Sequence, residues 1–175
     1  MNLAFITDLV FPSRCLGCRI IMARNPRRKE ACVLCDRCRS KIPLHPTLFC
    51  ATCRARLPYG EKICHRTATY VLGAATDYQN EIAERLIKGL KFGYIRDAAR
   101  PLASLLFEYL EHLSLQRGYD VVIPVPLSSE RERARGFNQA RLIAAELGKL
   151  NNLMVESNTL VRTRHTKAQY ELSSI

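Results

Sequence analysis

The chain has 175 residues, of which 47% are hydrophobic and 25% charged, a balance that is typical of a folded globular protein and excludes a disordered one. A formal net charge of +11 favours polyanionic partners, namely nucleic acid, phosphorylated small molecules or an anionic membrane surface, without choosing among them. No stretch reaches the roughly 18 apolar residues that a membrane helix needs, and residues 1–10 lack the pattern of a signal peptide, so we expect a cytoplasmic protein with no membrane span.

The cysteines divide the chain into two regions. All eight lie between Cys15 and Cys64, in a segment that is also rich in Arg and Pro. After about residue 66 the sequence has longer periodic segments and no cysteine. We therefore predict a small cysteine-rich module over residues 1–66 and an α/β domain over residues 67–175.

Three Cys-x-x-Cys pairs predict zinc binding in the first region. Two residues between cysteines allow both sulfurs to face one metal ion, and two such pairs complete a tetrahedral site. The expected ligands of the first site are Cys15, Cys18, Cys35 and Cys38, whose spacing is typical of a four-cysteine zinc site. Disulfides fit poorly in a chain without a secretion signal, and redox Cys-x-x-Cys motifs do not usually occur three in a row.

The second zinc site is less complete. Its expected ligands are Cys50, Cys53 and Cys64. A fourth cysteine is expected at position 67, which is Thr67, and the available substitutes are Cys32 and His65. Because His65 directly follows Cys64, both could reach one metal only with unusual backbone geometry. A degenerate ribbon that binds zinc weakly or not at all is an equally open interpretation, and at either site the metal would take the place of a hydrophobic core.

The α/β region begins with a strand and two helices. Residues 69–75 are rich in β-forming side chains and predict a strand. Over residues 80–91, Ile82, Leu86 and Leu90 recur every four positions, which predicts an amphipathic helix. Pro101 suits the first turn of a second helix that extends to residue 112.

The next segment predicts a strand, a basic loop and a helix in that order. Residues 121–125 form an apolar run typical of a parallel strand, and the polar loop over residues 128–137 carries three arginines. Asn138 can cap the following helix, with Gly148 as its C-cap. A loop beyond a strand and before a helix N-terminus favours phosphate or pyrophosphate. A solvated loop in which Glu130 and Glu132 pair with the arginines is an equally open alternative.

Four segments contain sequence motifs that occur together, in the same order, in one protein family. They are the cysteine pairs; residues 87–92, Ile-Lys-Gly-Leu-Lys-Phe; residues 123–127 followed by Arg131 and residues 135–140, Arg-Gly-Phe-Asn-Gln-Ala; and the basic segment containing Arg162, Thr163, Arg164, Lys167, Gln169, Leu172 and Ser173. In this order, over nearly the whole chain, they resemble the ComF family of competence-associated proteins. Members of that family have an N-terminal double zinc ribbon and a type I phosphoribosyltransferase-like α/β fold, a parallel sheet with flanking helices.

The resemblance implies a role in DNA uptake during natural transformation. The implied partners are single-stranded DNA or DNA-uptake proteins, and intact members of the family bind phosphoribosyl pyrophosphate. The resemblance also makes the basic loop the pyrophosphate-side part of that site, with binding residues Arg131, Arg135, Gly136, Asn138 and Gln139.

Two features depart from the family pattern. The first is the missing fourth ligand of the second ribbon. The second is that the family continues into a strand with two acidic residues and a Thr- and Gly-rich loop for the ribose phosphate, whereas this chain has no Asp-Asp pair and no Thr-Gly dipeptide. We therefore expect a C-terminally truncated, partial phosphoribosyltransferase-like domain without transferase activity of its own.

Two alternatives to this interpretation stay open. One is a phosphoribosyltransferase that is active only when another segment completes it. The other is a zinc-ribbon nucleic-acid-binding protein. The second alternative has weak support from sequence, since basic residues are spread along the chain and no interleaved basic and aromatic stripe indicates base stacking.

Overall fold

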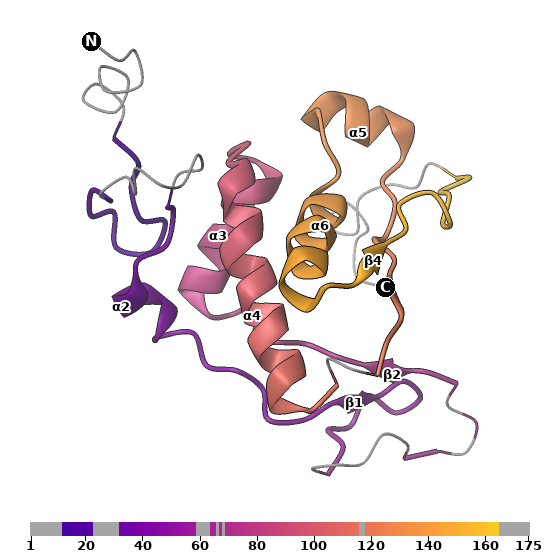
Figure 1. Ribbon diagram of the computed structural model, residues 1–175. Helices are drawn as coiled ribbons and strands as arrows, with labels where there is room; N and C mark the ends of the chain where they lie inside the picture. Colours follow the sequence, from indigo (N-terminus) through magenta and orange to yellow (C-terminus); the bar gives the residue numbers. More distant parts are fainter. Residues whose placement is uncertain are drawn as a thin grey trace, which may run out of the picture.

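The computed structural model describes residues 12–22, 32–58, 64–65, 67, 69–115 and 118–164. In this part of the chain three longer helices, α3, α4 and α6, lie side by side, and short two-stranded sheets lie at their edges (Figure 1). None of the helices in these ranges is both long and apolar enough to cross a bilayer. Residues 167–173 of the basic segment and the N-terminal residues 1–10 fall outside the described ranges.

Helices α3 (Glu81–Lys91) and α4 (Ala99–His112) confirm the two predicted helices, although α4 begins two residues before Pro101. The side-chain oxygen of Asn80 accepts hydrogen bonds from the amides of Ile82 and Ala83, which fixes the start of α3. A short 3₁₀ turn, η1 (Arg96–Ala98), joins the two helices. The ion pair between Arg100 and Glu146, at 3.4 Å, connects α4 to α6.

The hydrophobic core joins the cysteine-rich segment to the helices. Helix α2 (Asp36–Arg39) lies beside α3 in Figure 1. The buried residues of one cluster come from both regions: Cys15, Leu16, Val33, Leu34, Cys38 and Ile42 from the first, and Ala83, Leu86, Leu90, Leu102 and Leu105 from α3 and α4. A Cβ added at Gly89 would lie 3.1 Å from Cδ1 of Leu16, so α3 approaches the cysteine segment closely at this point. The domain boundary near residue 66 stays a prediction.

The strands are shorter than the sequence predicts. Strand β1 (Phe49–Cys50) pairs antiparallel with β2 (Val71–Leu72), the only residues of the predicted segment 69–75 in a ladder. Strand β3 (Val121–Val122) pairs in parallel with β4 (Met154–Val155), so the predicted strand over 121–125 ends early. Pro124 and Pro126 have no amide to donate to a ladder, which explains the early end. The chain is thus a mixed α/β protein with a small parallel sheet.

The predicted basic loop over residues 128–137 is mostly helical in the structure. Helix α5 (Ser129–Arg135) begins at Ser128, whose Oγ accepts from the amide of Arg131, and ends at Gly136 with a φ of 71°. Such a left-handed residue favours glycine, and it turns the chain toward the next helix. No residue of α5 is buried, so the sequence has no apolar periodicity that would predict this helix.

Helix α6 (Gln139–Asn151) has the predicted start but not the predicted end. Asn138 caps it through hydrogen bonds from the amides of Ala140 and Arg141. The predicted C-cap at Gly148 is wrong, because the helix continues to Asn151 and ends at Asn152, whose φ is 53°. Gly148 is buried where β4 crosses the helix, and a Cβ there would lie 2.5 Å from Cγ2 of Val155.

Candidate metal centres and a basic–aromatic surface

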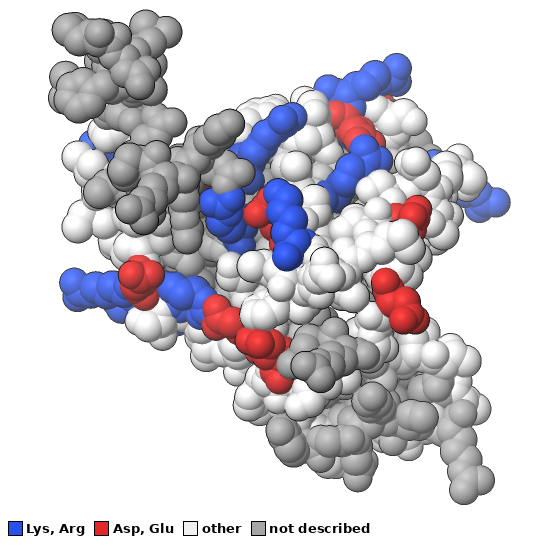
Figure 2. All heavy atoms as spheres, viewed as in Figure 1, with Lys and Arg blue, Asp and Glu red and all other residues white. Residues whose placement is uncertain are grey.

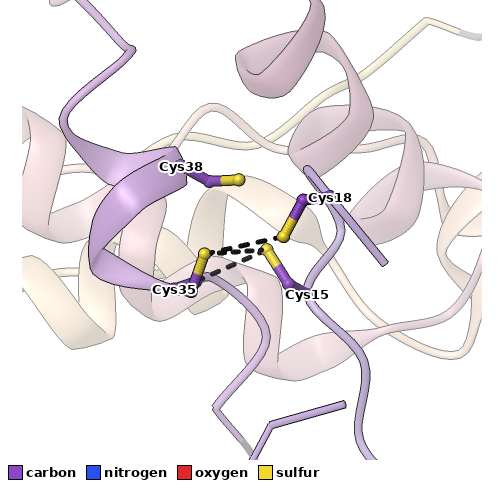
Figure 3. Close-up of side chains that lie close together, drawn as sticks. All are labelled: Cys15, Cys18, Cys35 and Cys38. Atoms are coloured by element: carbon purple, nitrogen blue, oxygen red, sulfur yellow. Dashed lines mark hydrogen bonds between the residues drawn. The ribbon is translucent and has the colours of Figure 1, made fainter. Parts of the chain in front are cut away.

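The first cysteine cluster brings together all four predicted ligands. Cys15 and Cys18 lie in one turn, while Cys35 and Cys38 lie at the start of α2 and within it, and the four sulfurs face a common space (Figure 3). The Cys35 sulfur lies 3.6 Å from that of Cys15 and 3.7 Å from that of Cys18. A tetrahedral zinc with Zn–S bonds of about 2.3 Å would separate its sulfurs by about 3.8 Å. The cluster therefore has the size of a four-cysteine zinc site.

A tight turn presents the first two sulfurs. The amide of Arg19 donates to the carbonyl of Cys15 at 2.8 Å, and Arg19 has a φ of 65°. Gly17 lies inside this turn, where a Cβ would come within 2.6 Å of the Cys38 sulfur. Its carbonyl accepts a hydrogen bond from Arg85 of α3 at 2.7 Å, so the helix holds the turn in place.

The second cluster contains the three predicted cysteines and one histidine. The ligand atoms of Cys50, Cys53, Cys64 and His65 all lie within 4.8 Å of one another. Of the two substitutes for the fourth ligand, His65 is the one that the structure brings to Cys64 and its partners. Cys32, the other substitute, is not in this cluster, and its sulfur lies 3.3 Å from the carbonyl of Leu34.

The thiol pKa values in both clusters diverge. Burial opposes ionisation of Cys15, but backbone hydrogen bonds from Cys18, Cys35 and Gly17 outweigh it and lower the pKa of this thiol to about 6. Burial and the neighbouring sulfurs raise the pKa of Cys38 to about 12. In the second cluster the Cys53 amide contributes most to lowering the pKa of Cys50 to about 6, whereas the Cys53 sulfur raises that of Cys64 to about 11. Ionisation of one thiol thus disfavours ionisation of the next, and a divalent cation would relieve the repulsion between the thiolates.

The predicted pyrophosphate-side residues are only partly brought together. Arg135 donates to Oε1 of Gln139 at 3.1 Å, and Gly136 is exposed between them. Asn138 is buried, and its side chain is already hydrogen-bonded, because it caps α6 and its Nδ2 donates to the carbonyl of Val125. Arg131 lies on α5, one turn before Arg135. Two amides at the α6 N-terminus are already bonded to Asn138, so fewer N–H groups remain for an anion than the sequence predicts.

Sequence reasoning missed two exposed aromatic residues beside this loop. Phe92 and Tyr94 follow α3 directly and are 59% and 61% exposed. The guanidinium of Arg135 lies over the Phe92 ring at 5.5 Å from its centroid. Arg96 lies over Phe137 at 4.8 Å and donates to the carbonyl of Gly136 at 3.1 Å. The end of α3 and the turn between α5 and α6 are thus joined into one surface, which we call the aromatic–arginine surface, defined by Phe92, Tyr94, Arg96 and Arg135.

Further basic side chains surround the aromatic–arginine surface. Figure 2 shows Lys and Arg side chains, with a few acidic ones among them, in the part of this face where Figure 1 shows α5, α6 and the upper end of α3. A cavity of about 240 Å³ between η1, α4 and α6 has three basic residues in its lining, Arg96, Arg100 and Lys149, and two acidic ones, Asp97 and Glu146. The signal available in the sequence was the segment Lys91 to Arg96, in which two aromatic residues lie between two basic ones.

The chain is similar to curated proteins along nearly its whole length. It is 28% identical to the DNA utilization protein YhgH of Salmonella typhi and 29% identical to that of Escherichia coli (strain K12), in each case over 95% of this chain and 74% of the relative. It is 29% identical to competence protein F of Haemophilus influenzae over 94% of this chain and 72% of the relative. No family model and no solved structure matches the chain. Together with the shared motifs, these relatives support the assignment of the chain to the ComF family.

Proposed function

We propose that this chain acts in DNA utilization in the cytoplasm by binding single-stranded DNA on the aromatic–arginine surface. The observation that carries the proposal is the position of the Arg135 guanidinium over the exposed ring of Phe92. The names of the relatives, which refer to DNA utilization and to competence, support the choice of DNA. The net charge of +11 supports a polyanionic partner.

Exposed aromatic rings beside arginines suit unpaired bases. Every base has a flat face that can stack on a ring, and such stacking contributes about 1–3 kcal/mol per base. Arginines next to the rings neutralise the phosphates that connect successive bases. Both kinds of group occur here within one surface, since Phe92 and Tyr94 are separated by one residue and Arg96 follows two residues later. In a duplex the bases are already stacked on one another, so this surface favours single strands.

Zinc at the first cluster would be structural in this function. Cys15 and Cys38 are buried in the same core as Leu86 and Leu90 of α3. A metal that joins their sulfurs would fix the turn around Gly17 and thereby the helix that ends at Phe92. The zinc would hold the binding surface in shape and would not contact DNA.

Fluorescence anisotropy with a labelled oligo-dT tests the DNA proposal. Phe92→Ala and Tyr94→Ala should each weaken binding by about 5- to 150-fold, the range that corresponds to the loss of one stacked base. Tyr70→Ala and Tyr78→Ala are matched controls, because these aromatics are also exposed but lie before α3. Equal affinity for all four variants would rule out this surface, and a wild-type chain without affinity for oligo-dT would rule out the DNA-binding function itself.

A pyrophosphate group is a second candidate ligand for the loop. Nε2 of Gln139 is buried and has no hydrogen-bond partner, next to Arg135, which supports an anion contact at this place. The phosphoribosyltransferase-like fold and a role for Arg131, Arg135, Gly136, Asn138 and Gln139 in binding phosphoribosyl pyrophosphate belong to this second proposal.

Hydrogen exchange in the presence of pyrophosphate tests this second candidate. Protection should appear in residues 131–139 of the wild-type chain and should be lost in Arg135→Ala. Equal protection in the variant would return the loop to a solvated, charged surface without a ligand.

A further inference from the structure

We infer that His65 is the fourth ligand of the second metal site, which makes it a Cys₃His centre in place of the four-cysteine centre that the repeated Cys-x-x-Cys pattern predicts. The ligands would be Cys50 Sγ, Cys53 Sγ, Cys64 Sγ and His65 Nδ1. The inference concerns the metal chemistry of the chain and is independent of the proposed DNA surface.

The first half of the second site has the same backbone as the first site. The amide of Arg54 donates to the carbonyl of Cys50 at 2.9 Å, as that of Arg19 does to Cys15, and Arg54 has a φ of 59°. The amide of Cys50 donates to the carbonyl of Ala55, five residues later, as that of Cys15 does to Ile20.

An isolated β-bridge closes each of these turns at the same offset. It joins Phe49 to Arg56 in the second site and Arg14 to Ile21 in the first. The Cys50–Cys53 turn is therefore an intact two-sulfur metal-binding turn, and it needs two more ligands to complete a tetrahedron.

The distances in the other half of the site fit one metal ion. The sulfurs of Cys53 and Cys64 are 3.9 Å apart, close to the separation of about 3.8 Å that tetrahedral Zn–S bonds require. The distance from Cys50 Sγ to His65 Nδ1 is shorter, 3.5 Å. A Zn–N bond of about 2.05 Å next to a Zn–S bond gives an expected separation of about 3.6 Å. Both separations thus fit a tetrahedral zinc that binds three sulfurs and one nitrogen.

The longer side chain explains how consecutive residues can serve one metal. The Nδ1 atom of a histidine is one bond farther from the backbone than a cysteine sulfur. The side chain of His65 can therefore reach back to the metal that its neighbour Cys64 binds. Thr67, which stands at the expected cysteine position, is exposed, and its hydroxyl is not a ligand that zinc prefers.

The other candidate side chains in the described part of the chain are engaged elsewhere. His45 lies 3.2 Å from the carboxylate of Asp77 and has Arg56 on its other ring nitrogen. Cys32 does not join the ligand group. His65 is accordingly the one remaining nitrogen or sulfur side chain among the described residues that the geometry brings to this site.

The two centres should then differ in charge and access. A four-cysteine zinc centre carries a formal charge of −2, whereas three thiolates with a neutral imidazole give −1. At the first site Cys15 and Cys38 are buried, while at the second only Cys50 is buried and the other three ligands are exposed. Chelators should therefore remove metal from the second centre first.

Cobalt substitution of the full chain tests the ligand set. The wild type should bind two equivalents of Co²⁺ in two separable phases, with thiolate-to-cobalt absorption in a ratio of four sulfurs to three. His65→Ala should lower the affinity of the second phase by at least about 100-fold, because even an outer partner of a ligand is worth roughly 10- to 100-fold. His65→Cys should not restore tight binding, because a cysteine sulfur at this position lies one bond closer to the backbone and falls short of the metal.

The first site serves as an internal control for folding, since its phase must stay unchanged in each variant. Thr67→Ala and His45→Ala should leave both phases as in the wild type. Unchanged second-phase affinity and spectrum in His65→Ala would overturn the assignment, and so would a wild-type chain that binds a single equivalent. Loss of the second phase in Thr67→Ala would assign the fourth position to the threonine instead.

Discussion

Gly17 shows how a single missing side chain shapes the first metal site. The turn that carries Cys15 and Cys18 passes so close to α2 that a Cβ on Gly17 would lie 2.6 Å from the Cys38 sulfur and 3.3 Å from the Ile82 side chain. A methyl group there would push one of the four ligands out of the tetrahedron. The Cys-x-x-Cys spacing alone does not reveal this, because it leaves both intervening positions unspecified.

Gly17→Ala should therefore weaken zinc binding at the first cluster. Overpacking of this kind costs about 1–3 kcal/mol, which corresponds to a loss of zinc affinity of about 5- to 150-fold if the cost falls on the metal-bound state. Competition with a chromogenic chelator measures the change. Gly118→Ala is the matched control, since a Cβ there would meet only the Leu115 carbonyl at 3.5 Å. Wild-type zinc affinity in Gly17→Ala would contradict the tight turn.

The contact between α6 and β4 depends on another close approach. Gly148 lies in the helix interior, where alanine would normally be favoured by about 1 kcal/mol. Here a Cβ would lie 2.9 Å from the backbone carbonyl of Leu153 and 2.5 Å from Cγ2 of Val155. A backbone atom cannot move aside as a flexible side chain can, so the steric cost should exceed the gain in helix propensity.

We expect Gly148→Ala to destabilise the fold by about 1–3 kcal/mol, as other overpacked positions do. Chemical denaturation followed by circular dichroism gives the free energy of unfolding. An increase in stability would show that propensity decides the outcome and that β4 does not pass over this residue.

The elements that sequence predicts well are those with local signals. Asn80 and Asn138 cap their own helices, and the four-residue spacing of Ile82, Leu86 and Leu90 lies within α3, so α3 and the start of α6 are found without knowledge of the rest. The strands are overestimated because their length depends on partners far away in the chain. Helix α5 was missed because none of its residues is buried, which leaves no apolar period to detect.

The candidate sites show the same difference between features with a local sequence signal and features that depend on distant parts of the chain. The four ligands of the first cluster were predicted because paired spacing is a local pattern. The aromatic–arginine surface was missed because Phe92 and Arg135 meet only after α4 and α5 have formed. The choice between His65 and Cys32 as substitute ligands stayed open because sequence does not show how the chain turns at Cys64.

At the scale of the whole molecule, the positive charge makes binding to nucleic acid depend on salt. Each phosphate that a basic side chain neutralises on a single strand contributes about −0.7 to the slope of log K against log salt. Arg135→Ala should make the slope for oligo-dT shallower by about this amount, whereas Phe92→Ala should lower affinity with an unchanged slope. Anisotropy titrations at several salt concentrations measure both. Parallel slopes for all proteins would mean that Arg135 does not contact a phosphate.

The close approach of Leu16 to Gly89 would couple zinc binding at the first cluster to DNA binding at the aromatic–arginine surface. Leu16 lies between Cys15 and Gly17, in the turn that presents two metal ligands, and Gly89 lies one turn of α3 before Phe92. A metal that stiffens this turn would reduce the conformational entropy that the end of α3 loses when a strand of DNA binds. Because such coupling is reciprocal, bound DNA would strengthen the binding of zinc by the same free energy. Zinc and DNA would be allosteric effectors of each other across the width of a single helix.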